Sequence, residues 1–268
     1  MIEIIGIDLD DTLLDTDKKI SQANIDAIKR VSQAGIKVVI TTGRPYFRII
    51  DFLKTIDLYS DSSFAISYNG SLISNATKTL IIDDIKLQHD DIVFIIEKLK
   101  KLGLHFNIYQ DEFIFSEEVL PLIKKQKVFE GIVFAIKPYD ELLKIQDASK
   151  IIICEHGETI DKMRSLVETA LEGRYNILRS TDLYLEILPK DANKGIALNK
   201  LMNYLQIDRT KAMAIGDEEN DLPMFKYVDF KVAMANGNEE LKRQASFITK
   251  SQNESGVAFA IDELVKID

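Results

Sequence analysis

Hydrophobic runs and amphipathic segments alternate at the start of the chain. Residues 4–7 and 36–40 are mostly apolar, with Lys37 the one charged residue, and rich in isoleucine and valine, which is typical of strands buried on both faces of a parallel sheet. Between them, residues 21–34 place apolar side chains near helical spacing, with Ser21 as the expected N-cap and Gly35 as the expected end. This strand, helix, strand order predicts the first half of a doubly wound α/β sheet.

The pattern continues with two short apolar runs around a turn. Residues 64–67 and 72–73 flank Asn69 and Gly70, a dipeptide that favours a tight connection between strands. The pattern changes after residue 82, where the segments become shorter and more amphipathic. Strands are predicted at residues 105–109, 112–116, 131–137, 150–155, 175–179 and 183–188, and a helix at residues 159–171.

The hydrophobic pattern of a buried α/β sheet returns near residue 191. A helix is predicted over residues 191–204, followed by strands at 213–215, 232–234 and 247–248 and a helix at 257–265. We therefore expect two domains, with residues 1–82 and 189–268 forming the core and residues 83–188 forming an inserted α+β domain.

Composition limits the partners of the protein. Lysine and arginine number 34 against 43 acidic residues, so the formal net charge is −9, and the predicted pI is near 5.0. Nucleic acid and anionic membranes both attract basic surfaces, so neither is expected as the main partner. The single cysteine, Cys154, excludes an intramolecular disulfide. We expect a cytoplasmic protein, because no signal-peptide pattern and no apolar run of membrane-spanning length occur.

Acidic residues follow the first predicted strand directly. Asp8, Asp10 and Asp11 stand where a structural strand would end in a neutral turn, and in open α/β sheets this end binds ligands. In an extended segment Asp8 and Asp10 would point to the same side. Two such carboxylates repel each other, which calls for a divalent metal, a shared proton or both. The alternative is that these acids cap a helix or solvate a loop.

Other strand ends carry groups suited to phosphate. Thr42 and Gly43 follow the second strand, where a hydroxyl and exposed backbone N–H groups can bind an anion. The alternative is an ordinary structural turn, because Thr-Gly turns are common between strands and helices. Lys194 opens the helix at 191–204, where its charge opposes the helix dipole unless an anion compensates it; the alternative is simple exposure. Asp217 follows a buried strand, as Asp8 does.

These strand ends would meet at one edge of a parallel sheet. There, Asp8 and Asp217 could hold Mg²⁺ through oxygen ligands, and Lys194 and Thr42 could offset phosphoryl charge. Asp8 could then attack phosphorus to give an aspartyl-phosphate that water hydrolyses, and Asp10 could protonate the leaving oxygen and later deprotonate the water. The residues therefore predict phosphoryl transfer.

The same residues resemble a known family. The segments Asp8–Leu13, Thr42–Arg44, Lys194–Gly195 and Gly216–Asp221 resemble, in order, the four motifs of the haloacid dehalogenase superfamily of phosphotransferases. The insertion before Lys194, with Tyr68-Asn69-Gly70 and Ser255-Gly256-Val257, resembles the Cof-type subfamily with a large α/β (C2-type) cap. The resemblance implies a Rossmann-like parallel sheet core with helices on both faces, a mobile cap, Mg²⁺ and hydrolysis of small phosphate monoesters.

The resemblance also assigns roles to residues. It implies that Asp8 is nucleophile and metal ligand, that Asp10 is the general acid/base and binds the metal through its carbonyl, and that Asp217 is a metal ligand. It further implies phosphate binding by Leu9, Thr42, Gly43, Lys194 and Asn220, with Asp221 supporting the metal from behind its ligands.

The expected function is a Mg²⁺-dependent phosphatase acting on a small phosphorylated metabolite, such as a sugar phosphate or a phosphorylated cofactor. A phosphomutase of the same fold and a ligand-binding regulatory module remain alternatives. Acyl or redox chemistry is disfavoured, because the three histidines lie outside these motifs. Closure of the inserted domain over the site is a further hypothesis.

Overall fold

The computed structural model describes residues 1–118, 133–154, 157–181 and 183–267. The chain forms two compact units. Unit 1 consists of Met1–Asp84 and Asn193–Asp268, and unit 2 consists of Ile85–Ala192. The chain thus leaves unit 1 once, builds unit 2 from a continuous segment, and returns to unit 1 at the residue before Lys194.

Unit 1 contains an eight-stranded sheet with the order β16-β15-β14-β1-β2-β3-β4-β5. All neighbours from β16 to β3 are parallel, and β4 and β5 are antiparallel additions at one edge. The strands are β1 (Ile4–Asp8), β2 (Lys37–Thr41), β3 (Phe64–Ser67), β4 (Leu72–Asn75), β5 (Ile81–Asp84), β14 (Ala212–Gly216), β15 (Phe230–Ala233) and β16 (Phe247–Ile248).

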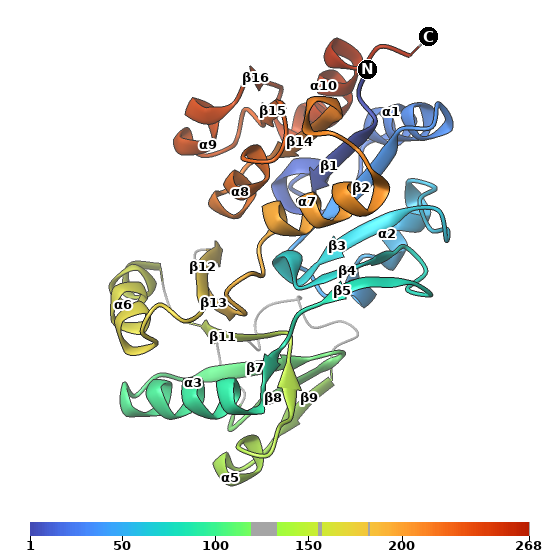
Figure 1. Ribbon diagram of the computed structural model, residues 1–268. Helices are drawn as coiled ribbons and strands as arrows, with labels where there is room; N and C mark the ends of the chain where they lie inside the picture. Colours follow the sequence, from blue (N-terminus) through green and yellow to red (C-terminus); the bar gives the residue numbers. More distant parts are fainter. Residues whose placement is uncertain (119–132, 155–156, 182, 268) are drawn as a thin grey trace. The chain divides into compact units, whose positions relative to one another are not determined.

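Helices cover both faces of this sheet. They are α1 (Gln22–Gln33), α2 (Ile50–Thr55), α7 (Lys194–Leu205), α8 (Leu222–Phe225), α9 (Glu239–Gln244) and α10 (Gly256–Leu264) (Figure 1). One core lies under α1, α2 and α10 and contains Ile5, Ile7 and Ile40. The other lies under α7, α8 and α9 and contains Ile4 and Val39. Burial on both faces explains why the central residues of β1 and β2 are apolar without alternation.

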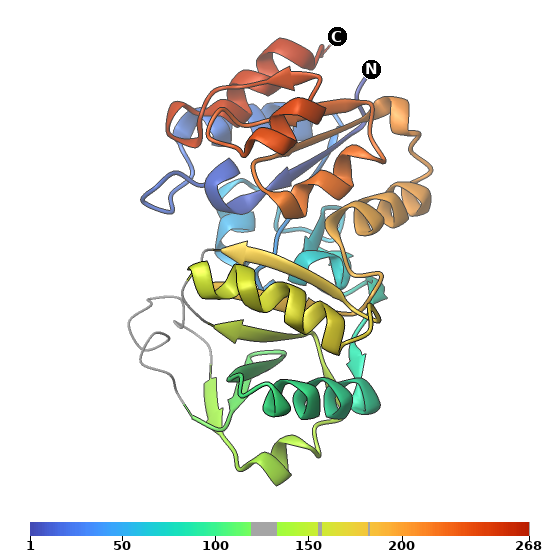
Figure 2. The same ribbon diagram turned by 90° about the vertical axis from the view of Figure 1, so that its left-hand side faces the viewer.

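Unit 2 contains a six-stranded sheet with the order β12-β13-β11-β7-β8-β9, and a two-stranded sheet of β6 and β10. Its strands and helices are β6 (Leu87–Gln88), α3 (His89–Lys101), β7 (Phe106–Gln110), β8 (Phe113–Ser116), β9 (Val133–Ile136), α5 (Tyr139–Leu142), β10 (Asp147–Ala148), β11 (Lys150–Cys154), α6 (Gly157–Ala170), β12 (Asn176–Thr181) and β13 (Tyr184–Leu188). α3 and α6 share one hydrophobic core against the larger sheet, and Figures 1 and 2 show both helices along it.

The predicted α/β fold class is confirmed, with a parallel sheet core and helices on both faces. Ser21 caps α1 by accepting a hydrogen bond from the Asn24 N–H, as predicted. The sequence pattern did not predict α3, although its apolar residues follow helical spacing. Of the predicted segments, residues 131, 132 and 155 lie outside the described residues.

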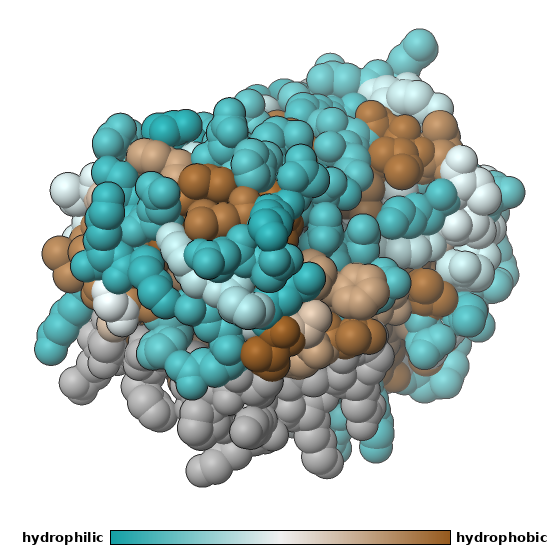
Figure 3. Space-filling model, turned by 90° about the horizontal axis from the view of Figure 1, so that it is seen from below, coloured by the Kyte–Doolittle hydropathy of each residue, from teal (hydrophilic) through white to brown (hydrophobic). Residues whose placement is uncertain are grey.

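The visible surface is mostly hydrophilic. Figure 3 shows one face on which hydrophobic residues form separate groups among polar ones. Within the described part of the chain, no helix has both the length and the apolar character needed to cross a membrane.

Candidate active site

The site begins at the carboxyl end of β1. The strand ends at Asp8, and residues Leu9–Leu13 form a single wide turn with Asp11 at φ 58°. Asp10 keeps an extended backbone conformation (φ −78°, ψ 129°) inside this turn, and the side chain of Leu9 is buried in the core below α1 and α10. Register places Thr41 of β2 beside Asp8, so the ends of these two strands lie together.

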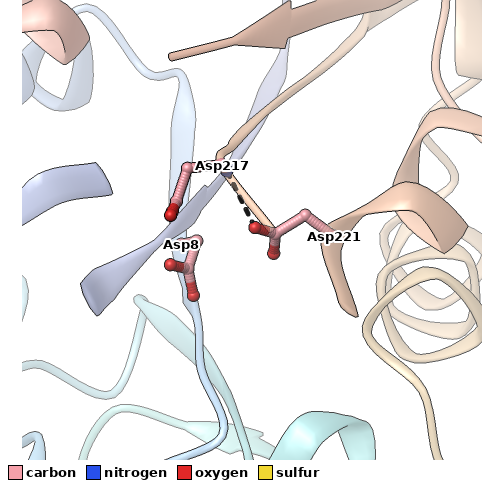
Figure 4. A group of neighbouring side chains, drawn as sticks. All are labelled: Asp8, Asp217 and Asp221. Carbon is pink, nitrogen blue, oxygen red and sulfur yellow. Dashed lines mark hydrogen bonds between the residues drawn. The ribbon is translucent and has the colours of Figure 1, made fainter. Parts of the chain in front are cut away.

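A second carboxylate enters from β14, the other neighbour of β1. This strand ends at Gly216, and Asp217 follows it. Asp221, four residues later, accepts hydrogen bonds through Oδ2 from the backbone N–H groups of Asp217 (3.0 Å) and Glu218 (3.1 Å). Figure 4 shows the carboxylates of Asp8, Asp217 and Asp221 near one another. Gly216 is required here, because an added Cβ would lie 2.5 Å from Cγ of Asp221.

Lys194 joins two of these carboxylates. It is the first residue of α7, whose N-cap Asn193 accepts a hydrogen bond from the Ile196 N–H. Its Nζ donates to Oδ1 of Asp8 (2.5 Å) and to Oδ1 of Asp221 (2.7 Å). The Lys194 side chain is 1% exposed. The exposed position considered for Lys194 is therefore wrong, and the compensating anions are protein carboxylates.

Three of these acids form a group that could hold a metal ion. Ligand oxygens of Asp8, Asp217 and Asp221 lie within 4.8 Å of one another, and all three residues are buried. Thr12 donates a hydrogen bond from Oγ1 to Oδ1 of Asp217 (2.5 Å), which fixes the orientation of that carboxylate. Carboxylate oxygens are the ligands that Mg²⁺ prefers, so the donor set fits the predicted ion.

The charges around this group also fit a divalent cation. Asp8, Asp217 and Asp221 carry three negative charges when ionised, and Lys194 carries one positive charge, so one divalent ion would neutralise the excess of two. The neighbouring ion pairs of Asp10 and Asp11 with Arg44 and Lys18 contain two acids and two cations and are balanced.

Burial and mutual repulsion act on the protonation of the cluster. Burial raises the pKa of Asp8 to about 7, with Lys194 opposing the shift and Asp221 adding to it. Burial raises the pKa of Asp217 to about 9, and the charges of Asp8 and Asp221 add to this shift. For Lys194 burial acts downward, but the two carboxylates outweigh it and hold its pKa above the usual value. Without a metal, the cluster therefore retains protons that a bound cation would displace.

Asp10 has different partners. Arg44 donates to both of its oxygens, from Nε to Oδ2 (2.8 Å) and from Nη2 to Oδ1 (2.6 Å), and Lys18 lies 3.3 Å from Oδ1. Burial would raise the pKa of Asp10, but these cations outweigh it and hold the pKa below its usual value. The Asp10 side chain is not one of the three carboxylates that could hold a metal in the described part of the chain. A role for its carbonyl stays a prediction.

The residues expected to bind phosphate lie on neighbouring loops. Thr42 is buried and follows β2 directly; its Oγ1 accepts a hydrogen bond from the Arg44 N–H (3.1 Å) and keeps its own O–H as a donor. Asn220 donates from Nδ2 to Oδ1 of Asn69 (3.1 Å). The same Asn69 side chain lies against Gly43, because a Cβ built there would be 2.9 Å from Nδ2 of Asn69.

The structure thus brings Asp8, Asp217, Asp221 and Lys194 into one cluster and links Gly43 to Asn220 through Asn69. Thr12, Lys18, Arg44 and Asn69 had no role predicted from the sequence. Three of these lie in segments quoted for the family resemblance, so their place in the motifs was the available signal. Lys18 follows the first motif by five residues and carried no such signal.

An acidic cluster with one buried lysine at the carboxyl edge of a parallel sheet defines a protein of the phosphoryl-transfer type. The comparisons with known proteins give the family. A model of the haloacid dehalogenase-like hydrolases matches residues 5–261, and the chain belongs to this family. It is accordingly a hydrolase acting on phosphate monoesters.

Individual relatives cover almost the whole chain. A Streptococcus pyogenes protein, provisionally named a phosphatase, is 32% identical over 98% of each chain. The 5-amino-6-(5-phospho-D-ribitylamino)uracil phosphatase of Bacillus subtilis is 31% identical, also over 98% of each chain. A solved haloacid dehalogenase-like hydrolase from Bacteroides thetaiotaomicron has a TM-score of 0.86 and 28% identity, covering 98% of this chain and all of the other.

Proposed function

We propose that the protein is a Mg²⁺-dependent phosphatase that hydrolyses small phosphate monoesters through an aspartyl-phosphate on Asp8. The observation that carries the proposal is the buried group of Asp8, Asp217 and Asp221 with Lys194 bonded to two of its members. A buried ion pair adds little net stability compared with a hydrophobic pair of similar volume. The buried carboxylates and lysine are therefore better explained by a chemical role than by stability alone.

Asp8 is the proposed nucleophile. Lys194 occupies its Oδ1, and within the described contacts no hydrogen bond reaches its Oδ2. In the first step a bond forms between a carboxylate oxygen of Asp8 and phosphorus, and the bond from phosphorus to the leaving oxygen breaks. In the second step water attacks phosphorus, and the bond to Asp8 breaks to release inorganic phosphate.

Asp10 is the proposed general acid and base. It would give a proton to the leaving oxygen in the first step and take one from water in the second. Its pairing with Arg44 favours the ionised form, which suits the second step. For the first step the pair with Arg44 has to loosen as substrate binds, so that Asp10 can carry the proton.

The proposed metal ligands are Asp8 and Asp217. Asp221 is proposed to support them without binding the metal, because its carboxylate already accepts hydrogen bonds from Lys194 and from the backbone N–H groups of residues 217 and 218. A bound Mg²⁺ would supply positive charge to the phosphoryl oxygens. Thr42, Gly43, Lys194, Asn220 and the Leu9 backbone are proposed to bind the remaining phosphate oxygens.

The test is phosphate release from a chemically diverse panel of monoesters, with Mg²⁺ and with EDTA. We expect Mg²⁺-dependent release by the wild type and a loss of at least about a thousandfold in Asp8→Asn, because this change removes the nucleophile. Asp17→Asn is the matched control, since Asp17 is an exposed carboxylate of the same segment outside the cluster.

Three outcomes would contradict the proposal. Equal phosphate release in Mg²⁺ and in EDTA would show that the reaction does not need a metal. Full activity of Asp8→Asn would show that Asp8 is not the nucleophile. Conversion of a sugar phosphate into its positional isomer, without free phosphate, would identify a phosphomutase instead.

The relatives narrow the proposed substrates. One is named for a phosphorylated ribitylaminouracil, and a Yersinia pseudotuberculosis relative, 25% identical over 91% of this chain, is named an HMP-PP phosphatase. We place the substrate of this protein among small phosphorylated metabolites, including sugar phosphates and phosphorylated cofactors. The segment 83–188 is proposed as the cap that selects among them, and the cytoplasm as the compartment where they are found.

A further inference from the structure

One turn of unit 1 contacts three of the chain segments proposed to bind phosphate. This turn, Tyr68–Gly70, connects β3 and β4. The backbone N–H of Asn69 donates to the carbonyl of Thr42 (2.9 Å), and its side chain accepts from Asn220 (3.1 Å). Gly70 packs so closely on the residue before Lys194 that a Cβ there would lie 2.3 Å from the Asn193 carbonyl oxygen. The turn therefore contacts the loops after β2 and β14 and the start of α7.

Asn69 is the central residue of this turn. It is fully buried and has φ 54° in the left-handed region, which asparagine tolerates better than most residues. Its carboxamide lies against Gly43, at 2.9 Å from the position of an added Cβ. A buried side chain in an uncommon backbone conformation is retained only where surrounding contacts hold it.

We propose that Asn69 is a positioning residue that orients Asn220 and the Thr42–Gly43 turn for phosphate binding. The inference rests on the proposed function, because it deepens the account of the same site. Oδ1 of Asn69 takes one N–H of the Asn220 amide, so the second N–H of that nitrogen remains for a phosphate oxygen. The backbone bond to Thr42 and the packing on Gly43 hold the loop that offers the other donors. Asn69 itself does not touch the phosphate.

The substitution that tests this role is Asn69→Gly. Glycine keeps the positive φ without strain and removes only the side chain, so the backbone bond to Thr42 is retained. Asn69→Ala is less suitable, because it would add strain at φ 54° to the loss of the carboxamide. Asn220→Ala removes the group through which Asn69 is proposed to act.

The first measurement is the affinity for inorganic phosphate in the presence of Mg²⁺, determined from the concentration dependence of the thermal midpoint. We expect phosphate affinity to fall about tenfold in Asn69→Gly and about tenfold in Asn220→Ala, the size of one lost hydrogen bond to a charged group. The double variant is expected to lose about tenfold to twentyfold, because the two residues act as one unit.

The second measurement separates positioning from stability. Asn75→Ala is the matched control, since Asn75 is a buried asparagine on β4 whose hydrogen bonds join the distal end of the same hairpin to Asp61, Thr79 and Leu80. We expect this variant to lower the thermal midpoint without changing phosphate affinity. In steady-state assays Asn69→Gly should raise KM more than it lowers kcat if Asn220 binds substrate and transition state alike.

The proposal is overturned if folded Asn69→Gly binds phosphate as tightly as the wild type, or if the losses in the double variant multiply to about a hundredfold. It is also overturned if Asn75→Ala weakens phosphate binding as much as Asn69→Gly does. Failure of the proposed phosphatase activity is distinguishable, because it would show as no turnover by a wild type that still binds phosphate, with an affinity that falls in Asn69→Gly.

Discussion

Thr12 illustrates how one hydroxyl acts on the cluster at the residue scale. It is fully buried, and its hydroxyl donates a hydrogen bond to Oδ1 of Asp217. Thr12→Val keeps the shape and removes this bond, which leaves the Asp217 carboxylate less well oriented. We expect the Mg²⁺ concentration for half-maximal activity to rise by about tenfold to a hundredfold, as for other groups that orient metal ligands. Thr55→Val, on an exposed helix position, should leave it unchanged; equal values for both variants would contradict the prediction.

Lys194 is predicted to contribute to both the stability and the activity of the protein. Lys194→Met fills a similar volume but leaves Asp8 and Asp221 buried without their cation. Breaking a buried pair in this way costs about 3–5 kcal/mol of unfolding free energy, and loss of the proposed phosphate contact should lower kcat by about a hundredfold or more. Denaturant unfolding and steady-state kinetics measure the two effects.

The control for this change lies on the same helix. Lys200→Met removes a partly exposed ion pair with Asp83, which is worth at most about 1 kcal/mol. A Lys194→Met protein as stable and active as Lys200→Met would show that the buried pair has neither role.

The raised pKa values predict a pH dependence of stability in the absence of metal. Because burial raises the pKa of Asp8 to about 7 and of Asp217 to about 9, the folded state binds more protons than the unfolded state between about pH 4 and pH 9. The stability that these two carboxyl groups contribute is fully present below their unfolded-state pKa near 3.8. It is lost as pH rises through their folded-state pKa values.

The thermal midpoint in EDTA should therefore fall between pH 5 and pH 9. Mg²⁺ should raise it most at the alkaline end, because metal binding replaces the protons. A midpoint in EDTA that stays constant or rises over this range would contradict the assignment of the shifts to these two residues.

At the scale of the elements, the site depends on how closely α7 approaches its neighbours. Gly195 follows Lys194, and a Cβ at this position would lie 2.1 Å from the Pro223 carbonyl oxygen of α8. Gly195→Ala must therefore shift backbone, and we expect a loss of about 1–3 kcal/mol in unfolding free energy together with weaker phosphate binding.

Gly103→Ala is the comparison for this prediction. Gly103 has φ 70° and nothing within 4 Å of an added Cβ, so its substitution reports backbone strain without a collision. If Gly195→Ala leaves phosphate affinity as intact as Gly103→Ala does, then the approach of α7 to α8 does not position Lys194.

Strand order also explains which site residues were predictable. The sequence pattern placed acids at the ends of β1 and β14, and the parallel pairing of these strands brings Asp8 and Asp217 together. The sequence marked Asn69 as part of a turn and of the family resemblance but gave it no role, because nothing in the local pattern shows that its side chain reaches Asn220, 151 residues away. Likewise, the spacing of Asp8 and Asp10 suggested a shared site, whereas Arg44 binds the Asp10 carboxylate.

At the scale of the whole molecule, the insertion predicts a response to ligands. If the segment 83–188 acts as a mobile cap, protease cleavage near Asp83 and Leu188 should slow in the presence of Mg²⁺ and a phosphate mimic. Sodium dodecyl sulfate gels of timed digests would measure this. Unchanged cleavage at both positions, with binding of the mimic verified by thermal shift, would count against closure.

The sequence by itself determined most of the strands, the helices α1, α6, α7 and α10 and the identity of the acids, because hydrophobic periodicity and strand-end chemistry are local properties. It also carried the family, through four motifs spread along the chain. Only the tertiary structure decided which of these groups bond to each other. Asp8 pairs with Lys194, Asp217 with Thr12 and Asp10 with Arg44. These pairs join residues as many as 205 positions apart, so sheet order and packing, not local pattern, bring them within hydrogen-bond distance.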